Sequence, residues 1–352
     1  MKKIILSSFA ASLMLQSDMI KLDDITVTTA TKTEKKIEGV TASVEVVTSE
    51  EIEKTGASTL KGVFKQLPSL TAQYARFPHP SSASKAAISI RGAGANGTLM
   101  LIDGKRISSE TENPYLMDRI PASMIEKIEI VKGSMSTLYG SDAIGGVINI
   151  ITKKSDTPVT TFDVKYGQNA DGDGKEKSAN FSTMGKKGKL GYKIFGSMVK
   201  TTPFTIEKSY TQQAKNPSTH DDVADPVNGV SGTIPVTYQD KSTVKTIGLG
   251  LDYDISERTK VGFDASYFTE EREGQYIGTH PRPRPDLPTN KVNVAGTPVY
   301  SVDDNKRKDF SMYAEHAFSD DFVVKASVYR SDYEKRNATT AINDLSYTDG
   351  NT

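Results

Sequence analysis

After Pro158 the chain alternates between apolar and small or polar positions, the period-2 pattern that is typical of strands with two different faces. In residues 243–254, for example, Ile, Leu and Tyr take one face, whereas Gly and Asp take the other. The pattern predicts seven strands, at about Val159–Gly167, Ser178–Met184, Lys189–Lys200, Thr243–Asp254, 259–270, Asp309–Phe318 and Phe322–Tyr333.

The connections between these strands alternate between long and short. They are residues 168–177, 185–188, 201–242, 255–258, 271–308 and 319–321. Such alternation favours an outer-membrane β-barrel, which has short turns at one rim and long loops at the other. A soluble antiparallel sheet with two long insertions is the alternative. Because a closed barrel has an even number of strands, we expect more chain after Thr352.

Residues 23–154 have a different pattern, which predicts a compact domain of helices and short strands. Thr48 and Glu51 have the spacing of a capping box, so a helix should begin there and end at Gly56. The apolar spacing over Leu60–Leu67 predicts a second helix. Short apolar runs then predict strands at Ala87–Ile90, Thr98–Ile102, Ile128–Val131 and Val147–Ile151.

The first residues have the pattern of a secretory signal peptide. Lys2 and Lys3 precede an apolar run, Ile4–Leu15, that is too short to span a bilayer. We therefore predict a signal peptide over residues 1–17, with a buried N-terminal helix as the alternative.

Composition excludes several kinds of function. Lys plus Arg and Asp plus Glu both number 44, which argues against a nucleic-acid partner. The absence of Cys excludes disulfides and Cys-ligated metals. The four His residues lack metal-ligand spacing. We predict no catalytic residue, no metal site and no cofactor held by the protein itself.

Several motifs resemble the plug domain of TonB-dependent outer-membrane receptors. They are GASTLKGVFKQLPSL at 56–70, ISIRG at 88–92, TLMLIDGKRIS at 98–108, IPASMIEKIEIVKG at 120–133 and GSDAIGGVINIITKK at 140–154. The run at 135–154 is most similar to the catecholate siderophore and colicin I receptor branch, although the vitamin B12 transporter shares much of it.

The resemblance implies an α+β plug domain followed by an antiparallel transmembrane β-barrel of about 22 strands, of which this chain would supply about seven. It also implies residence in the bacterial outer membrane, in contact with its lipid. The implied division is a TonB-box segment over residues 18–30, the plug domain over 31–154 and the N-terminal part of the barrel over 155–352.

Asp24, Ile25, Thr26, Val27 and Thr28 match the TonB box of the family in composition and position. The resemblance implies that TonB, working with ExbB and ExbD, binds such a segment by pairing an extended strand with its own sheet. β-Branched residues favour that conformation. An ordinary first strand of the plug domain is the alternative.

The resemblance also implies where a ligand binds, namely the outer loops of the plug domain at about Tyr74–Ser84 and Ser108–Tyr115. The candidate residues combine a cation with aromatic rings, which suits an anionic ferric catecholate that brings its own Fe(III). They are Tyr74, Arg76, Phe77, His79 and Tyr115. A plain solvated loop is the alternative.

Arg91 and Lys132 match the two positions that seat the plug against the barrel wall in the family. Arg91 keeps the family's arginine. Lys132 replaces the second arginine and lacks its bidentate fork, so half of the seating contact departs from the family pattern.

Two motifs suggest other chemistry. Gly92, Gly94 and Gly97 form a GxGxxG pattern, but a strand is predicted after it, where a nucleotide site requires a helix. Residues 169–174 resemble the start of a calcium loop, but the twelfth position is Asn180 and not Glu, so a hairpin turn is favoured.

The resemblance thus implies a transporter and not an enzyme, one that imports a ferric siderophore, with the catecholate type favoured. The alternatives are a cobalamin or haem receptor of the same family, or a truncated product that does not transport. Bacteriocins are possible further partners of the same surface.

Overall fold

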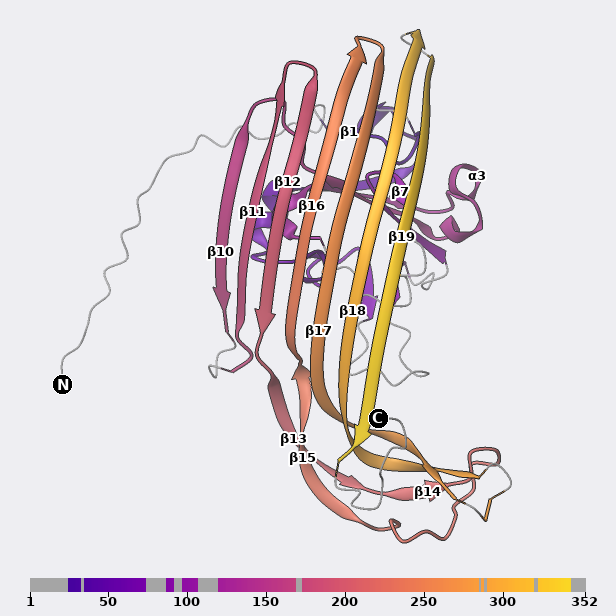
Figure 1. Cartoon of the computed structure of the whole chain (residues 1–352). Coiled ribbons are helices and arrows are strands. Elements are labelled where there is room, and N and C mark those ends of the chain that lie inside the picture. Colours follow the sequence, from indigo (N-terminus) through magenta and orange to yellow (C-terminus); the bar gives the residue numbers. More distant parts are fainter. Residues whose placement is uncertain are drawn as a thin grey trace, which may run out of the picture.

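The structure, a computed structural model, describes residues 25–32, 35–73, 87–91, 97–106, 120–168, 173–284, 286–287, 290–319 and 322–342. Within these ranges the chain forms a small α/β domain, called here the N-terminal domain, and one large antiparallel sheet (Figure 1). None of the helices in these ranges is long and apolar enough to cross a membrane.

The N-terminal domain is built on a five-stranded sheet with the order β3-β8-β9-β6-β7. Only the pairing of β6 with β9 is parallel among these neighbours. Two further pairs, β1 with β2 and β4 with β5, lie beside it. The strands are β1 (Thr26–Val27), β2 (Lys35–Lys36), β3 (Ser43–Thr48), β4 (Leu70–Gln73), β5 (Ala87–Ile90), β6 (Thr98–Ile102), β7 (Lys105–Arg106), β8 (Ile125–Lys132) and β9 (Gly146–Thr152).

The two faces of this sheet are covered by different parts of the chain. One face carries Ile128, Ile130, Ile148 and Ile150, which pack against the helices in the main core. The other face carries Leu99, Leu101, Val131 and Val147 and packs against Ala30 of the N-terminal segment. The helical elements are α1 (Ser49–Lys54), α2 (Leu60–Phe64) and α3 (Ser136–Tyr139), with short 3₁₀ turns at Ile37–Gly39, Ala122–Met124 and Ser141–Ala143.

The helix signals in the sequence are confirmed, with one shortened end. Thr48 and Glu51 form the predicted capping box at the start of α1, and Gly56 follows its end with a φ of +67°. Helix α2 ends at Phe64 and not at Leu67. The amides of Gln66 and Leu67 bond to carbonyls three residues back, so the last turn tightens before Pro68.

All seven predicted strands of the C-terminal part are present, as neighbours in the large sheet. Its order is β10-β11-β12-β16-β17-β18, with β14 and β19 both paired to β18. A separate hairpin pairs β13 with β15. The strands are β10 (Val159–Gly167), β11 (Glu176–Lys187), β12 (Leu190–Thr201), β13 (Phe204–Thr211), β14 (Gln213–Lys215), β15 (Ser231–Gln239), β16 (Lys241–Ser256), β17 (Thr259–Pro283), β18 (Lys291–Ser319) and β19 (Phe322–Ala341).

The prediction of a long connection over residues 271–308 was wrong. β17 and β18 continue through most of it as strands of 25 and 29 residues, and only residues 284–290 connect them. Periodicity did not show this extension because residues 270–275, EEREGQ, contain no apolar side chain on either face. The structure satisfies these polar groups across the strands, as where Asn305 donates to buried Glu270 at 3.2 Å.

The other long connection, residues 202–240, is folded and not loose. It contributes the β13–β15 hairpin, and it places β14 against the far end of β18. The connections before and after it along the chain, residues 188–189 and 257–258, are short turns.

The large sheet has the reverse of the polarity of a water-soluble sheet. Its outer face exposes large apolar side chains, among them Phe162 (71%), Met312 (64%) and Val328 (77%). Its inner face is polar and covered, with buried groups on β17 and β18 that include Glu270, Arg272, Asp303, Asn305, Arg307 and Ser311. This arrangement suits a sheet whose outer face meets lipid while its inner face meets polar groups or water.

The apolar residues on the outer face form a band that crosses the sheet diagonally. At the β10 edge the band covers Phe162 to Tyr166, and at the β19 edge it covers Phe322 to Val328. One ladder row starts with aromatic residues and ends with charged ones: Phe162, Phe181, Gly196, Ile247, Tyr267, Lys308 and Asp332. The apolar layer of a membrane is flat. A band that runs diagonally across the paired residues of the sheet can lie in such a layer only if the strands are tilted within it, as in membrane barrels.

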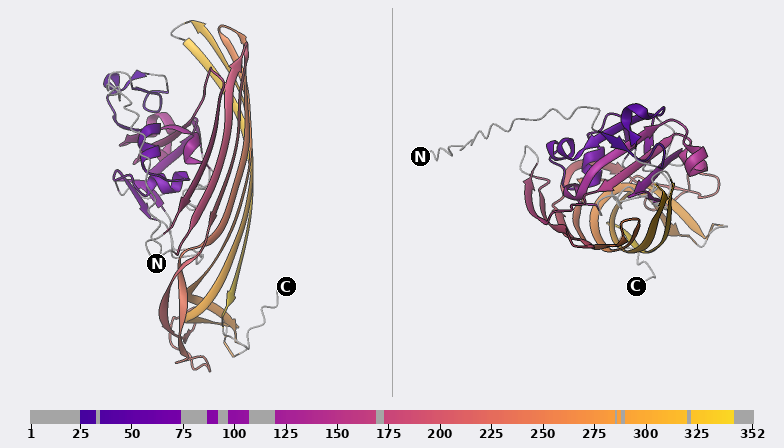
Figure 2. Two further views of the ribbon diagram at one scale, coloured as in Figure 1. Left: turned by 90° about the vertical axis from the view of Figure 1, so that its left-hand side faces the viewer. Right: turned by 90° about the horizontal axis from the view of Figure 1, so that it is seen from above.

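The N-terminal domain lies against the concave, inner face of the large sheet. Both views in Figure 2 show this, and the view from above shows the sheet as an arc around one side of the domain. The short turns of the sheet and the β13–β15 hairpin lie at opposite ends of the long strands (Figure 1).

We predict that Gly146→Ala destabilises the N-terminal domain by about 2–4 kcal/mol. Gly146 has a φ of +142°, and a Cβ there would lie 2.3 Å from the carbonyl oxygen of Val131 on the paired strand. The measurement is thermal or urea unfolding of the intact protein. Gly39→Ala is the control, because no atom lies within 4 Å of its added Cβ. Equal stability of the two variants would contradict this packing argument.

We predict that Met312→Lys lowers the stability of the sheet in lipid vesicles by about 2–4 kcal/mol, because it places a charge within the apolar band. Val302→Lys lies on the same face of the same strand but outside the band, beside Glu273 on β17, so its effect should be small. The measurement is the urea dependence of folding of the intact protein into vesicles. If Val302→Lys costs as much as Met312→Lys, this face does not contact lipid at Met312.

Candidate functional site

The N-terminal segment, residues 25–30, lies docked on the N-terminal domain. Thr26 and Val27 pair with Lys36 and Lys35, and the amide of Ile37 donates to the carbonyl of Ile25 at 3.0 Å. The side chain of Val27 is completely buried. The predicted TonB-box residues Ile25, Thr26, Val27 and Thr28 are thus part of a folded segment, while Asp24 lies outside the described residues.

Glu129 on β8 holds this segment by its backbone. Its buried carboxylate accepts from the amide of Thr28 at 3.1 Å and from the amide of Thr29 at 2.9 Å. It also accepts from the hydroxyl of Thr29. A buried carboxylate requires such donors, since an unpaired charge away from water is costly.

Two neighbours complete the contact with the segment. The ammonium group of Lys127 lies 3.0 Å from the Glu129 carboxylate and donates to the carbonyl of Thr26. The hydroxyl of Tyr139 donates to the carbonyl of Thr29 at 2.8 Å. Burial, together with the charge of Glu129, raises the pKa of Tyr139 to about 12. The phenol therefore keeps its proton at neutral pH and remains a donor.

Asn149 on β9 is the register partner of Glu129 and contacts both the N-terminal segment and the β6–β7 turn. Its amide nitrogen donates to the hydroxyl of Thr29 at 3.0 Å. Its amide oxygen accepts from the backbone N–H of Gly104 at 3.1 Å. The two residues are polar positions inside the apolar runs IEIV and VINII, and these interruptions are the sequence signal that marks them.

A second set of contacts joins the N-terminal domain to the large sheet. Lys105, in the β6–β7 turn region, donates to Asp264 on β17 at 2.7 Å and to Ser311 on β18 at 2.5 Å. Lys193 on β12 donates to the hydroxyl of Thr152 at 2.9 Å. Sequence reasoning did not find these residues, because partners 159 and 206 positions away leave no local pattern.

A cavity of about 160 Å³ lies between the domain and the sheet at these contacts. Charged groups on both sides line it, and several apolar side chains complete its wall. The charged groups are Asp103, Lys105, Arg106, Lys193, Asp264, Arg307, Asp309 and Arg330. The interface is therefore incompletely filled, and charged groups lie beside apolar ones in it.

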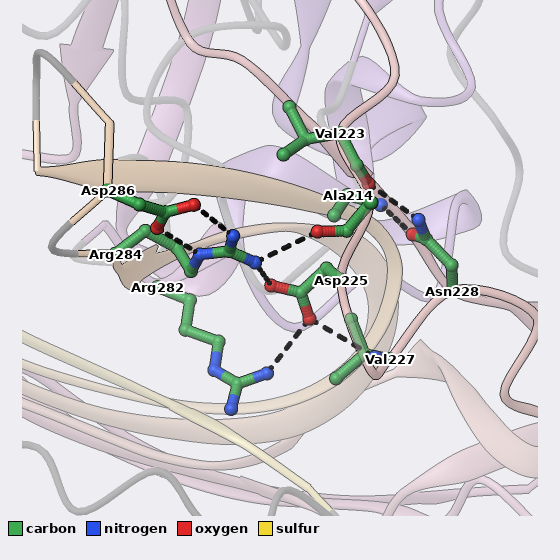
Figure 3. A network of polar contacts seen from close by, with 9 residues as sticks. Ala214, Val223, Asp225, Val227, Asn228, Arg282, Arg284 and Asp286 are labelled. Atoms are coloured by element: carbon green, nitrogen blue, oxygen red, sulfur yellow. Dashed lines mark hydrogen bonds and ion pairs between the residues drawn. The ribbon is translucent and has the colours of Figure 1, made fainter.

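A third polar cluster orders the far end of the long strands. The fully buried side chain of Asp225 accepts from Arg282 at 3.1 Å and from Arg284 at 2.6 Å (Figure 3). Arg284 also binds Asp286 and holds the pKa of that carboxyl below its usual value. Nearby, Ala214, Val292 and Val294 form a small apolar core. This end of the sheet is therefore ordered by its own polar cluster and its own apolar core.

The two predicted seating residues lie in the N-terminal domain. Arg91 is exposed with a φ of +51°, and no ion pair joins it to another residue in the described part of the chain. Lys132 lies 2.5 Å from the carboxylate of Glu45 on the neighbouring strand β3. Their seating role against a barrel wall stays a prediction.

The predicted ligand-binding residues Tyr74, Arg76, Phe77, His79 and Tyr115 lie outside the described residues. Gly92 and Gly94 of the GxGxxG pattern also lie outside them, and the residues after Gly97 form strand β6, as predicted. Within the described ranges, no group of three or more Asp, Glu or His could hold a metal ion.

The comparisons with known proteins agree with this architecture. Residues 36–147 match the family model "TonB-dependent Receptor Plug Domain". The vitamin B12 transporter BtuB of Vibrio vulnificus is 32% identical over 279 residues, which cover 76% of this chain and 44% of that protein. The iron-regulated outer membrane virulence protein of Vibrio cholerae is 36% identical over 217 residues, or 57% of this chain and 31% of that protein.

Among solved structures, a mutant of the ferric enterobactin receptor of Pseudomonas aeruginosa is similar with a TM-score of 0.50 and 16% identity. The match covers 90% of this chain and 57% of that one. The likeness concerns the fold alone. The chain thus spans less than half the length of the two curated relatives above.

The predicted fold, a plug domain followed by an antiparallel sheet of the outer-membrane receptor kind, is confirmed, whereas the catecholate and colicin I branch stays a prediction. Residues 36–147 match the plug domain of TonB-dependent receptors, and the chain is homologous to TonB-dependent receptors of the bacterial outer membrane.

Proposed function

We propose that this chain takes part in the TonB-dependent import of a ferric siderophore across the outer membrane, with the catecholate type favoured. The observation that carries the proposal is the docked segment Ile25–Thr28, a β-branched strand held on a plug domain by one buried carboxylate and a few hydrogen bonds. The segment can therefore leave the domain as a unit, while the main core with the helices stays intact.

The mechanism requires the segment to exchange partners. Pairing with the sheet of TonB uses the main-chain groups of Thr26 and Val27, which pair with β2 in the docked state. Ligand bound outside would bias the equilibrium toward the undocked state, and TonB, energised through ExbB and ExbD, would pull on it. A pull would loosen the plug from the sheet, and the unfilled cavity between them leaves fewer contacts to break there. No covalent bond of the ligand breaks.

The cationic and aromatic residues Tyr74, Arg76, Phe77, His79 and Tyr115 are the proposed ligand contacts. An anionic iron–catecholate complex offers both charge and aromatic faces to such a set. Fe(III) would arrive with the siderophore as cargo. Bacteriocins could use the same outer surface.

Cobalamin import is the second candidate, and one observation favours it. Of the two curated relatives described above, the one matched over the larger share of this chain is named a vitamin B12 transporter. The second relative is named for its regulation by iron. A haem receptor is the remaining alternative within the family.

We predict that Thr26→Pro abolishes energised uptake and lowers binding to the C-terminal domain of TonB by at least about 100-fold. Proline removes the N–H that an added strand donates and disfavours strand pairing. Thr26→Val, which keeps the backbone and the β-branch, should retain uptake. Uptake is measured in cells, and binding is measured with purified TonB domain. Undiminished uptake by Thr26→Pro would show that this segment is not the TonB box.

We predict that Arg76→Ala weakens binding of a ferric catecholate by about tenfold, because it removes a cation that faces an anionic ligand. Binding is measured on purified outer membranes with an iron-labelled tris-catecholate. Arg76→Lys keeps the charge and should lose less. Uptake of labelled cobalamin, with no binding of the catecholate, would instead select the second candidate.

A further inference from the structure

One turn of the plug domain, Asp103–Gly104 between β6 and β7, is linked by hydrogen bonds both to the docked segment and to the large sheet. Both residues have a positive φ, +49° and +76°, as a tight hairpin turn requires. The N–H of Gly104 is bound by Asn149, which also holds Thr29 of the segment.

The same turn is attached to the large sheet on both sides of Gly104. On one side, the Asp103 carboxylate accepts from the amide and the hydroxyl of Thr152 at 2.9 and 2.8 Å. The Thr152 hydroxyl in turn accepts from Lys193 of β12. On the other side, Lys105 binds Asp264 of β17. Two residues of the large sheet, Lys193 and Asp264, therefore constrain the turn.

We propose that Glu129 is the latch that keeps the predicted TonB box docked, and that Asn149 couples this latch to the contact between plug and sheet. The proposal rests on the proposed function, since it assumes that residues 25–28 must undock. Both are positioning residues that act on the segment through hydrogen bonds and contact no ligand.

Glu129 fits a latch because the segment supplies most of its donors. Three of its hydrogen-bond contacts come from Thr28 and Thr29, and Lys127 bridges it to the carbonyl of Thr26. If the segment leaves, the carboxylate loses these donors and has to be hydrated instead. The docked state is therefore favoured until a pull on the segment or a displacement of Asn149 offsets this loss.

Asn149 fits a coupling residue because its single amide has a different partner at each end. Gly104 N–H requires the oxygen, so the nitrogen must face Thr29. If the turn moves and displaces Gly104, the side-chain amide of Asn149 loses the hydrogen bond that orients it. The Thr29 hydroxyl then loses the aligned N–H of Asn149. The latch weakens in this way although none of the Glu129 contacts described above is with the large sheet.

The latch is tested with a single reactive thiol at Val27→Cys. The chain contains no Cys, and Val27 is completely buried, so labelling by a maleimide reports release of the segment. Labelling is measured on the intact protein in outer membranes that lack TonB. We expect Glu129→Gln to raise the labelling rate at least about tenfold, because a neutral amide replaces an acceptor for several donors. An unchanged rate would overturn the latch.

Thr29→Val is a second test that leaves the plug sheet unaltered, because this residue lies on the departing segment. It removes the hydroxyl that donates to Glu129 and accepts from Asn149. Thr28→Val is the matched control, since Thr28 binds Glu129 through its backbone amide, which the substitution keeps. We expect faster labelling in Thr29→Val alone. Equal rates in the two variants would overturn the role of the hydroxyl and hence of Asn149.

The coupling is tested by a double-mutant cycle with Lys105→Ala and Asn149→Leu in the same labelling assay. If Asn149 carries the signal, Lys105→Ala raises the rate in the parent protein but adds little when Asn149 is already replaced. Independent, multiplicative effects would overturn the coupling. Protease resistance of residues 35–152 verifies in each variant that the plug domain is folded.

This assay separates the inference from the proposed function. The latch operates without TonB, so altered labelling supports it even if the purified TonB domain fails to bind the segment, a result that would instead overturn the proposed function. Binding of TonB to the parent protein with no effect of Glu129→Gln on labelling would leave the function standing and remove the latch.

Discussion

The structure depends on one constraint, which is that the inner face of the large sheet is polar and has to be satisfied. Buried groups such as Glu270, Arg272 and Asp303 lie on it, whereas large apolar side chains lie exposed on the outer face. A buried charge away from water and partners costs several kcal/mol, so each must find a partner on a neighbouring strand, on the plug domain or in water. Such a sheet can lie in lipid on one side only if its other side meets polar groups.

The plug domain supplies partners for this polar face, but it does not fill the whole interface with the sheet. Lys105 and Lys193 donate hydrogen bonds across it, and a cavity lined by both charged and apolar side chains lies beside them. An apolar interface of the same area would hold the domain more permanently. A polar one that water can enter is easier to separate, because water replaces the hydrogen bonds as the domain moves. The interface therefore has the physical properties that the proposed loosening of the plug requires.

The same reasoning explains why the predicted TonB box can be both folded and available. Val27 is buried, but the segment pairs with only two residues of β2 and depends on Glu129 for much of its hydrogen bonding. Most of the apolar core of the domain lies on the opposite face of its sheet, around Phe64 and Ile148. Loss of the segment therefore removes a small part of the folding energy, which keeps local release separate from global unfolding.

The sequence by itself determined whatever depends on local periodicity. The capping box at Thr48, the alternation that marks the seven long strands and the ordered plug motifs were all readable, because each depends on neighbours within about ten residues. Where local polarity misled, as over residues 271–308, long-range pairing between β17 and β18 supplied partners that periodicity does not show.

Only the tertiary structure decided which polar residues act together. Glu129 and Asn149 belong to separate apolar runs, and their register on adjacent strands brings them together under Thr29. Lys105 and Asp264 belong to different parts of the chain, and the curvature of the sheet around the plug domain brings them into contact. Hydrogen bonds and ion pairs act over about 3 Å in space, so distance along the chain does not predict them.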